Sequence, residues 1–197
     1  MKQRAARKRN EVLIVGAWAS LVLIGFGYLH TYGARAGELA DGPQTWRDGT
    51  LEGAAGRARV LLFAHPRCSC TRASIAELTH VVEAHALRAT VVFWQPEGAD
   101  AEWRASPTVD MVQQHPLLDA AWDPGGKVCR SFDAATSGQC LVYDANGRLR
   151  FSGGITAGRG HEGANEGRQT VDRLLSESGD PPTGVHTFPV FGCRLEG

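Results

Sequence analysis

Two cysteines separated by one residue, Cys68 and Cys70, are the part of this sequence best suited to chemistry. Residues two apart span at most about 7 Å, and a disulfide needs Cα atoms about 4.4 to 6.8 Å apart, so a bond between them requires a bent backbone. Such a small ring is strained, and strain makes a disulfide easier to reduce. The spacing therefore predicts a thiol–disulfide exchange site in which Cys68 attacks and Cys70 resolves.

A strand and a helix must position this pair. Residues 59–64 form a short apolar run typical of a buried strand, and residues 71–87 carry apolar side chains at helical spacing. The cysteines precede this helix and lie next to Arg67 and Arg72, where the helix dipole and positive charge favour a thiolate. Pro66 and Arg67, at the junction, are expected at the rim of the site.

Alternating apolar runs along the rest of the chain predict further strands and helices. They are a strand at 90–94, helices at 108–115 and 127–132, a hairpin with strands at 140–143 and 148–152, and a last helix at 170–176. Asn146-Gly147 supplies the hairpin turn, because this dipeptide readily adopts positive φ. The expected order is β, α, β, α, a β-hairpin and α, which indicates an α/β domain.

The amino-terminal part of the sequence predicts a membrane anchor. Residues 12–34 carry no formal charge, and a helix of this length reaches roughly 35 Å, enough to cross a hydrocarbon layer of about 30 Å. Five cations precede it within residues 2–9. The positive-inside rule then predicts a single pass through the inner membrane, a cytoplasmic amino terminus and a periplasmic domain. A cleaved signal peptide is the alternative, because Ala34-Arg35-Ala36 has the small-x-small form of a cleavage site.

These features divide the chain of 197 residues into five parts. They are a basic stub (1–11), a transmembrane anchor in contact with the lipid bilayer (12–34), a linker (35–56), a folded domain (57–178) and a C-terminal tail (179–197). The 21 Lys and Arg residues balance 21 Asp and Glu residues. Because phosphate binding needs an excess of clustered cations, this balance argues against nucleic acid as a partner.

Three further cysteines complete an odd total of five, so at least one thiol is left without a partner inside the chain. Cys129 and Cys140 fit buried thiols, with a structural disulfide between them as the alternative. Cys193 lies in a tail that is too apolar to remain in solvent. We expect this tail to fold back onto the domain and to bring Cys193 near another cysteine.

The element order and the cysteine position resemble the thioredoxin fold, and most closely the membrane-tethered TlpA-type and RedB-like proteins of bacterial envelopes. The resemblance covers residues 57–178, through VLLFAHPRCSCTRASIAEL, WDPGGKVCRSFDAATSGQCLVYDANGRLRFSGG and the closing helix. It implies an α/β thioredoxin-like domain that needs no cofactor and acts on the disulfides or thiols of client proteins. A membrane thiol donor would supply the electrons for a reductant.

The sequence departs from that family at two positions. The usual Cys-x-x-Cys is Cys-x-Cys here, which leaves Thr71 where the second cysteine would stand. Gly138 takes the position of the family's cis-proline, which normally borders the disulfide and shapes the substrate groove. The resemblance therefore places Thr71 and Gly138 at the rim of the site.

Copper binding is the main alternative to disulfide chemistry. Two thiolates suit Cu(I), which prefers soft ligands, and Sco-type copper-delivery proteins have a similar plan of anchor, thioredoxin fold, cysteine pair and late histidine. That resemblance implies a copper site of Cys68, Cys70 and His161, with His65 as a second candidate. Residues 153–167 hold six glycines and are expected to border the site. A scaffold that keeps the fold without the chemistry is a third possibility.

Overall fold

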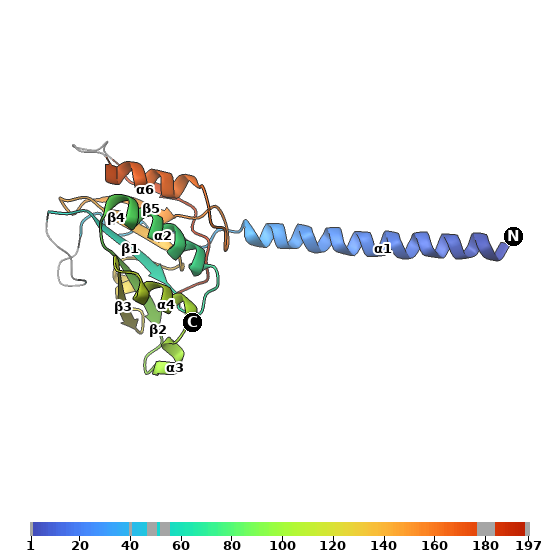
Figure 1. Ribbon diagram of the computed structural model, residues 1–197, viewed down its shortest axis with the longest axis horizontal. Helices are drawn as coiled ribbons and strands as arrows, with labels where there is room; N and C mark the ends of the chain where they lie inside the picture. Colours follow the sequence, from blue (N-terminus) through green and yellow to red (C-terminus); the bar gives the residue numbers. More distant parts are fainter. Residues whose placement is uncertain (1, 40, 47–50, 52–55, 177–183, 196–197) are drawn as a thin grey trace. The chain divides into compact units, whose positions relative to one another are not determined.

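The computed structural model describes residues 2–39, 41–46, 51, 56–176 and 184–195 (Figure 1). The chain divides into two units, residues 1–35 and 36–197. Parts of the expected linker and tail, including residues 52–55 and 179–183, and the last two residues of the expected domain, 177 and 178, lie outside the described residues.

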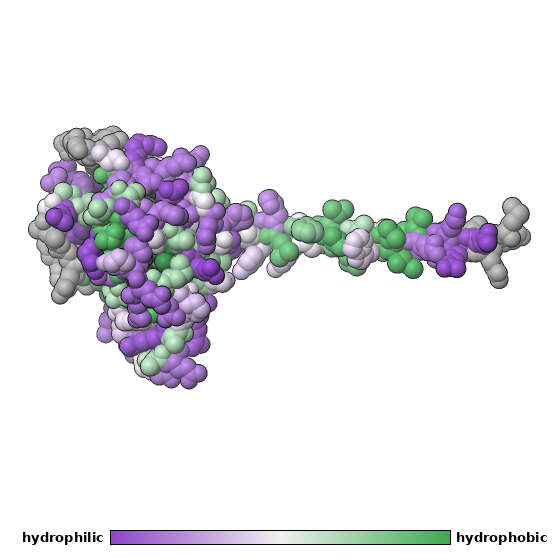
Figure 2. All heavy atoms as spheres, viewed as in Figure 1, coloured by the Kyte–Doolittle hydropathy of each residue, from purple (hydrophilic) through white to green (hydrophobic). Residues whose placement is uncertain are grey.

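The first unit is one helix, α1 (Lys2–Gly33), and it contains the predicted anchor. Its segment Asn10–Gly33 has a mean hydropathy of 2.2 and is long and apolar enough to cross a membrane. Figure 2 shows apolar side chains along this helix and hydrophilic ones towards its amino-terminal end. The residues expected as a separate basic stub continue the same helix, where Arg7 and Glu11 form an i,i+4 ion pair of 3.0 Å.

The second unit is built on a six-stranded mixed sheet in the order β3-β2-β1-β4-β5-β6. The strands are β1 (Arg59–Ala64), β2 (Ala89–Gln95), β3 (Leu118–Pro124), β4 (Gln139–Tyr143), β5 (Leu149–Gly154) and β6 (His186–Phe188). Strands β1, β2 and β3 are parallel, β4 is antiparallel to β1 and β5, and β6 pairs parallel with β5. The central strand β1 is buried on both faces, as its continuous apolar run predicts.

Helices cover the sheet and close two hydrophobic cores (Figure 1). They are α2 (Thr71–His85), α3 (Ala101–Arg104), α4 (Pro107–Gln114), α5 (Lys127–Ser131) and α6 (Glu166–Ser176). One core joins Leu62 of β1 to apolar residues of α2, α4 and α6. The other joins Leu61 and Phe63 of β1 to Phe132, which follows α5. Alternate residues of β1 therefore serve opposite faces of the sheet.

The predicted strands and helices are confirmed, and the structure adds β3, α3 and β6. Strand β3 lies at an edge and buries only Leu118 and Asp123 fully, so its sequence lacks an apolar run. Helix α3 is a single turn, and β6 is three residues long. The last helix begins four residues before the predicted start because the Asn165 side chain accepts a hydrogen bond from the backbone of Arg168 at 2.8 Å.

Segments on both sides of the predicted domain pack against it. The Tyr143 hydroxyl donates to the carbonyl oxygen of Pro43 at 3.0 Å, and the Trp46 ring lies 5.3 Å from that of Tyr143. At the other end of the chain, Val190 and Leu195 are fully buried. The compact unit thus begins at residue 36 and includes the described part of the tail.

The pairing of β5 with β6 yields a first prediction. A Cβ atom at Gly153 would lie 2.6 Å from the backbone nitrogen of Phe188 and 2.7 Å from its oxygen. Because backbone atoms cannot rotate away, we expect Gly153→Ala to release β6 from the sheet. Hydrogen exchange of the β6 amides should accelerate at least about tenfold, whereas Thr187→Ala, at an exposed position on β6, should leave it unchanged. Unaltered protection in the Gly153 variant would contradict the described docking of the tail.

Candidate functional site

The cysteine pair lies where β1 ends and α2 begins. The backbone nitrogen of Cys68 donates to His65 oxygen at 3.0 Å, and that of Thr71 donates to Cys68 oxygen at 3.1 Å, so two turns bend the chain. Cys70 occupies the position directly before α2 and makes no side-chain capping hydrogen bond. Cys68 is only 3% exposed and Cys70 is half-buried. Both sulfurs are thus attached at a helix amino terminus, where the dipole favours a negative charge.

A third cysteine meets the pair from the C-terminal tail. The Sγ atom of Cys193 lies 2.9 Å from the Sγ atom of Cys68. All five cysteines are free thiols, and Cys193 is exposed. The tail folds back onto the domain as expected, and the cysteine to which it brings Cys193 is Cys68.

Backbone contacts fix the tail next to Cys193. The carbonyl oxygen of Cys193 accepts from Ser137 nitrogen at 2.8 Å, and Leu195 nitrogen donates to Ala135 oxygen at 2.9 Å. Gly192 leaves no room for a side chain, since a Cβ atom there would overlap the carbonyl oxygen of Ser137. The loop before β4 therefore sets the position of the Cys193 sulfur.

The same loop contacts the cysteine motif. The Ser137 hydroxyl accepts from the backbone nitrogen of His65 at 2.8 Å and lies 2.5 Å from Thr71 Oγ1. Gly138 donates its N–H to Phe63 oxygen at 2.7 Å, and its φ of +95° is one that glycine adopts at little cost. Ser137 thus ties the end of β1, the start of α2 and the tail together.

Four residues were expected at the rim. Pro66 and Arg67 directly precede Cys68. Thr71 bonds to Cys68 oxygen, and Gly138 bonds to Phe63 oxygen near the end of β1. Arg67 is exposed, whereas Pro66, Thr71 and Gly138 are buried. The two positions at which the sequence departs from the TlpA-type pattern therefore support the site from inside.

The contacts move the acidities of the three thiols in different directions. Burial disfavours the Cys68 thiolate, but hydrogen bonds from Cys193 and Thr71 outweigh it and lower the pKa of Cys68 to about 7. Although Cys193 is exposed as a residue, partial burial of its sulfur against Cys68, with the hydrogen bond and charge of Cys68, raises the pKa of Cys193 to about 12. Burial and the charge of Cys68 also raise the pKa of Cys70, while Arg159 opposes that rise. Cys68 is therefore the most readily ionised of the three thiols, and Cys193 can donate a hydrogen bond to its thiolate.

Aromatic rings gather beside the cysteine motif. The His65 ring stacks on Trp94 with centroids 5.4 Å apart and meets Trp103 edge-on at 5.7 Å. The guanidinium of Arg67 lies 5.3 Å from the Trp103 ring centre. Burial and the charge of Arg67 lower the pKa of His65, which favours a neutral ring. The sequence did not indicate that either tryptophan borders the site. Trp94 belongs to the apolar run of β2, and Trp103 lies on the single-turn helix α3.

Arg159 links the glycine-rich segment to the site. Its Nη1 atom donates to the carbonyl oxygen of Gly192 at 2.6 Å, and its guanidinium opposes the rise in the pKa of Cys70. Further along the segment, Gly163 donates its N–H to the buried carboxylate of Glu77 on α2 at 2.5 Å. The segment therefore borders the site, and Arg159 is the residue that the sequence did not single out.

The other predicted ligands and cysteines do not join this cluster. Cys129 and Cys140 lie in the two different cores, on opposite faces of the sheet, so the structure gives no support to a bond between them. Burial raises the pKa of Cys140 to about 12 and also raises that of Cys129. His161 is exposed, and the described residues contain no group of three or more His, Cys, Asp or Glu that could hold a metal ion. The expected copper ligands are therefore not assembled.

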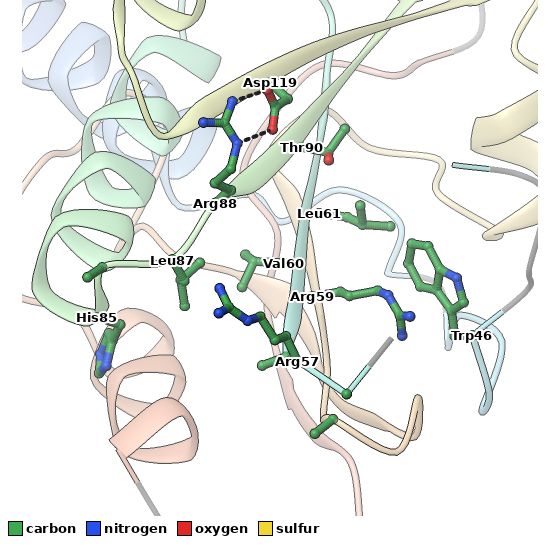
Figure 3. A pocket seen from close by; sticks show the side chains of 14 residues that line it. Trp46, Arg57, Arg59, Val60, Leu61, His85, Leu87, Arg88, Thr90 and Asp119 are labelled. Carbon is green, nitrogen blue, oxygen red and sulfur yellow. Dashed lines mark hydrogen bonds and ion pairs between the residues drawn. The ribbon is translucent and has the colours of Figure 1, made fainter. Parts of the chain in front are cut away.

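A cavity of about 560 Å³ opens at the other end of β1 (Figure 3). Arg88 and Asp119 face each other there and form an ion pair, and Arg59 lies beside the Trp46 ring. No cysteine is among the described residues that line it. The thiol cluster is thus separate from this cavity.

The sequence matches no protein-family model and no curated protein. Among solved structures, the chain is similar to the hypothetical protein SMc02350 from Sinorhizobium meliloti 1021, at 20% identity over 72% of this chain and 80% of that chain, with a TM-score of 0.52. It is also similar to an uncharacterized conserved protein from Geobacillus kaustophilus, at 14% identity over 83% and 93%, with a TM-score of 0.55. The exposed lipoprotein thioredoxin Etrx1 from Streptococcus pneumoniae strain TIGR4 matches at 17% identity over 61% and 84%, with a TM-score of 0.42.

The fold is thioredoxin-like. A parallel β3-β2-β1 half joins an antiparallel β4-β5 hairpin, and a cysteine motif lies at the junction of β1 and α2. An apolar helix long enough to cross a membrane precedes this thioredoxin-like domain. At identities of 14% to 20%, this similarity shows the fold alone.

The hydrogen bond between the two sulfurs yields a second prediction. We expect alkylation of Cys68 to rise with pH around a midpoint of about 7, because only the thiolate reacts. Cys193→Ala removes the donor and should move this midpoint upwards by about one pH unit. Rates at Cys68 can be followed by mass spectrometry in a Cys70→Ser background. Cys129→Ala, which removes a thiol outside the cluster, should leave the midpoint in place; an unmoved midpoint in Cys193→Ala would contradict the role of the bond.

Proposed function

We propose that this protein is a membrane-anchored thiol–disulfide oxidoreductase of the bacterial envelope, with Cys68 as its attacking thiolate. The observation that carries the proposal is the hydrogen-bonded Cys68 sulfur, 2.9 Å from Cys193, with a pKa lowered to about 7. An ordinary cysteine, with a pKa of about 8.5, is only a few per cent ionised at neutral pH. The lowered pKa of Cys68 gives it a larger thiolate fraction there.

The exchange proceeds in two steps. The Cys68 thiolate attacks one sulfur of a client disulfide, so that a Cys68–client bond forms and the other client sulfur leaves as a thiolate. A second thiol of the protein then attacks the Cys68 sulfur and releases the client as a dithiol. Two electrons pass to the client, and the protein is left with a disulfide. A dithiol donor at the membrane must return the electrons, and the reverse sequence oxidises a client.

The aromatic rings beside Cys68 support a polypeptide client. His65, Trp94 and Trp103 present partly exposed ring surfaces, and Arg67 next to them is exposed. Aromatic side chains bind extended peptide segments through apolar contact at little entropic cost. A client disulfide held against these rings would lie close to the end of β1, where Cys68 is.

The apolar helix supports a location at the inner membrane. Residues 12–34 would contact the lipid bilayer, and the five cations within residues 2–9 favour an amino terminus in the cytoplasm. The thioredoxin-like domain would then lie in the periplasm, where disulfides form and persist. A domain held at the membrane is also within reach of a membrane thiol donor.

Copper delivery has less support than thiol exchange. Cys68 and Cys193 offer two soft donors, but His161 is exposed and does not join them. We expect His161→Ala to bind Cu(I) as tightly as the unmodified reduced protein in competition with a chromogenic chelator. Loss of affinity in that variant would show that His161 is a ligand and would favour the copper alternative.

Reduction of a disulfide substrate tests the proposed function directly. We expect the reduced full chain in detergent to reduce insulin or a disulfide-bonded peptide, and Cys68→Ser to lose the activity by at least about a hundredfold. Cys129→Ala should retain it, with circular dichroism used to verify folding of both variants. Equal activity of Cys68→Ser and the unmodified protein would contradict the proposal, and no activity in any form would favour a scaffold.

A further inference from the structure

We propose that Cys193, rather than Cys70, resolves the mixed disulfide on Cys68, so that the docked tail supplies the second redox-active thiol. This inference rests on the proposed oxidoreductase function and adds the identity of the resolving residue. It changes the catalytic couple from a local Cys-x-Cys to a pair that is 125 residues apart in sequence.

Distance favours Cys193 as the partner of Cys68. Their sulfurs are 2.9 Å apart, and a disulfide bond is about 2.0 Å long, so closure needs a movement of about 1 Å. A bond from Cys68 to Cys70 would instead close a small ring inside the turn that leads into α2, where Thr71 nitrogen is bonded to Cys68 oxygen. The Cys193 bond can form without disturbing that turn.

The fold holds the tail in place for this contact. Ser137 bonds both to the tail, through Cys193 oxygen, and to the start of α2, through Thr71. Arg159 bonds to Gly192, the residue before Cys193. Because Cys68 is only 3% exposed, the client reaches it when the tail shifts. The tail is held by the three-residue strand β6, by the buried Val190 and Leu195 and by a few backbone bonds, so its opening is a local event that costs less than unfolding.

The charge of Cys68 determines when Cys193 can lose its proton and attack. In the reduced protein, partial burial and then the hydrogen bond and negative charge of Cys68 keep Cys193 protonated. When Cys68 forms the mixed disulfide, that charge is lost while the nearby Arg159 remains. The proton of Cys193 passes to the client thiolate that has just left, and the Cys193 thiolate attacks Cys68 Sγ. The Cys68–Cys193 bond forms, the Cys68–client bond breaks, and the second client sulfur leaves and takes a proton from water.

The difference in exposure between Cys193 and Cys68 determines which sulfur of their disulfide a donor attacks. Cys193 is exposed whereas Cys68 is buried, so a donor thiolate reaches Cys193 first. Attack there expels Cys68, whose low pKa makes it the better leaving group. The second thiol of the donor then attacks the donor sulfur bonded to Cys193 and releases Cys193. The donor is oxidised to a disulfide, and both protein thiols are restored.

Peptide mapping distinguishes the two resolving residues. Trypsin cleaves after Arg67, Arg72, Arg173 and Arg194, so residues 68–72 carry Cys68 and Cys70, and residues 174–194 carry Cys193. The full chain is oxidised with diamide, its free thiols are blocked with N-ethylmaleimide, and the protein is digested. We expect 68–72 to be cross-linked to 174–194 with Cys70 blocked. An internal disulfide within 68–72, with Cys193 blocked, would overturn the inference and leave the oxidoreductase proposal intact.

Trapping provides an independent test with a disulfide-bonded peptide as substrate. Cys193→Ser should accumulate the Cys68–peptide mixed disulfide, with release slowed at least about a hundredfold because a resolving thiol inside the protein is lost. Cys70→Ser and the control Cys129→Ala should not accumulate it. Accumulation in Cys70→Ser alone would identify Cys70 as the resolving thiol, whereas failure of any variant to form a mixed disulfide would contradict the proposed function itself.

A variant that keeps every cysteine tests the role of the docked tail. Gly192→Ala places a methyl group against Ser137 oxygen and should displace Cys193. We expect the yield of the 68–72 to 174–194 cross-link to fall at least about fivefold. An undiminished yield, in a protein whose far-ultraviolet circular dichroism matches the original, would show that the docked geometry is not what pairs the two cysteines.

Discussion

The hydrogen bond between the Cys68 and Cys193 sulfurs is the interaction on which the proposed chemistry of this site depends. Cys68 is buried, and burial alone would raise its pKa and leave it an inert thiol. The donors from Cys193 and Thr71 reverse that effect and lower the pKa to about 7. The amino terminus of α2 also favours the Cys68 thiolate through its dipole. Only the hydrogen bond with Cys193 places a second sulfur next to Cys68.

The sheet makes this contact possible by joining segments that are distant in sequence. The carboxyl end of β1 carries the cysteine motif, and its antiparallel neighbour β4 begins at the same edge, so the loop with Ser137 and Gly138 meets Cys68 there. Strand β6 then adds to β5, which is paired with β4, and delivers the tail to that loop. Glycine at Gly153 and Gly192 permits the close backbone approach that this path requires. The end of the sheet at which β1 ends and β4 begins thereby brings together segments that are far apart in the sequence.

Sequence reasoning located the elements that bury apolar surface and missed those held by backbone pairing. The run at residues 59–64 and the helical spacing at 71–87 are strong local signals, so β1, α2 and the cysteine pair were placed correctly. Strand β3 exposes most of its side chains at an edge, and β6 is three residues long, so neither has an apolar pattern. The apolar tail was expected to dock, but which thiol Cys193 meets depends on the register of β5 with β6. No local sequence pattern encodes that register. No local pattern indicates that Arg159 contacts the tail either.

The low pKa of Cys68 also bears on the direction of electron flow. A couple whose thiolate is stabilised favours its reduced form, so its reduction potential rises and it becomes a weaker reductant. The same hydrogen bond that makes Cys68 nucleophilic therefore works against a strongly reducing protein. Contacts that hold Cys193 against Cys68 act in the opposite sense, because a preorganised pair closes its disulfide at lower entropic cost. The tail thus contributes to both sides of the equilibrium: its thiol stabilises the Cys68 thiolate, and its docking favours closure of the disulfide.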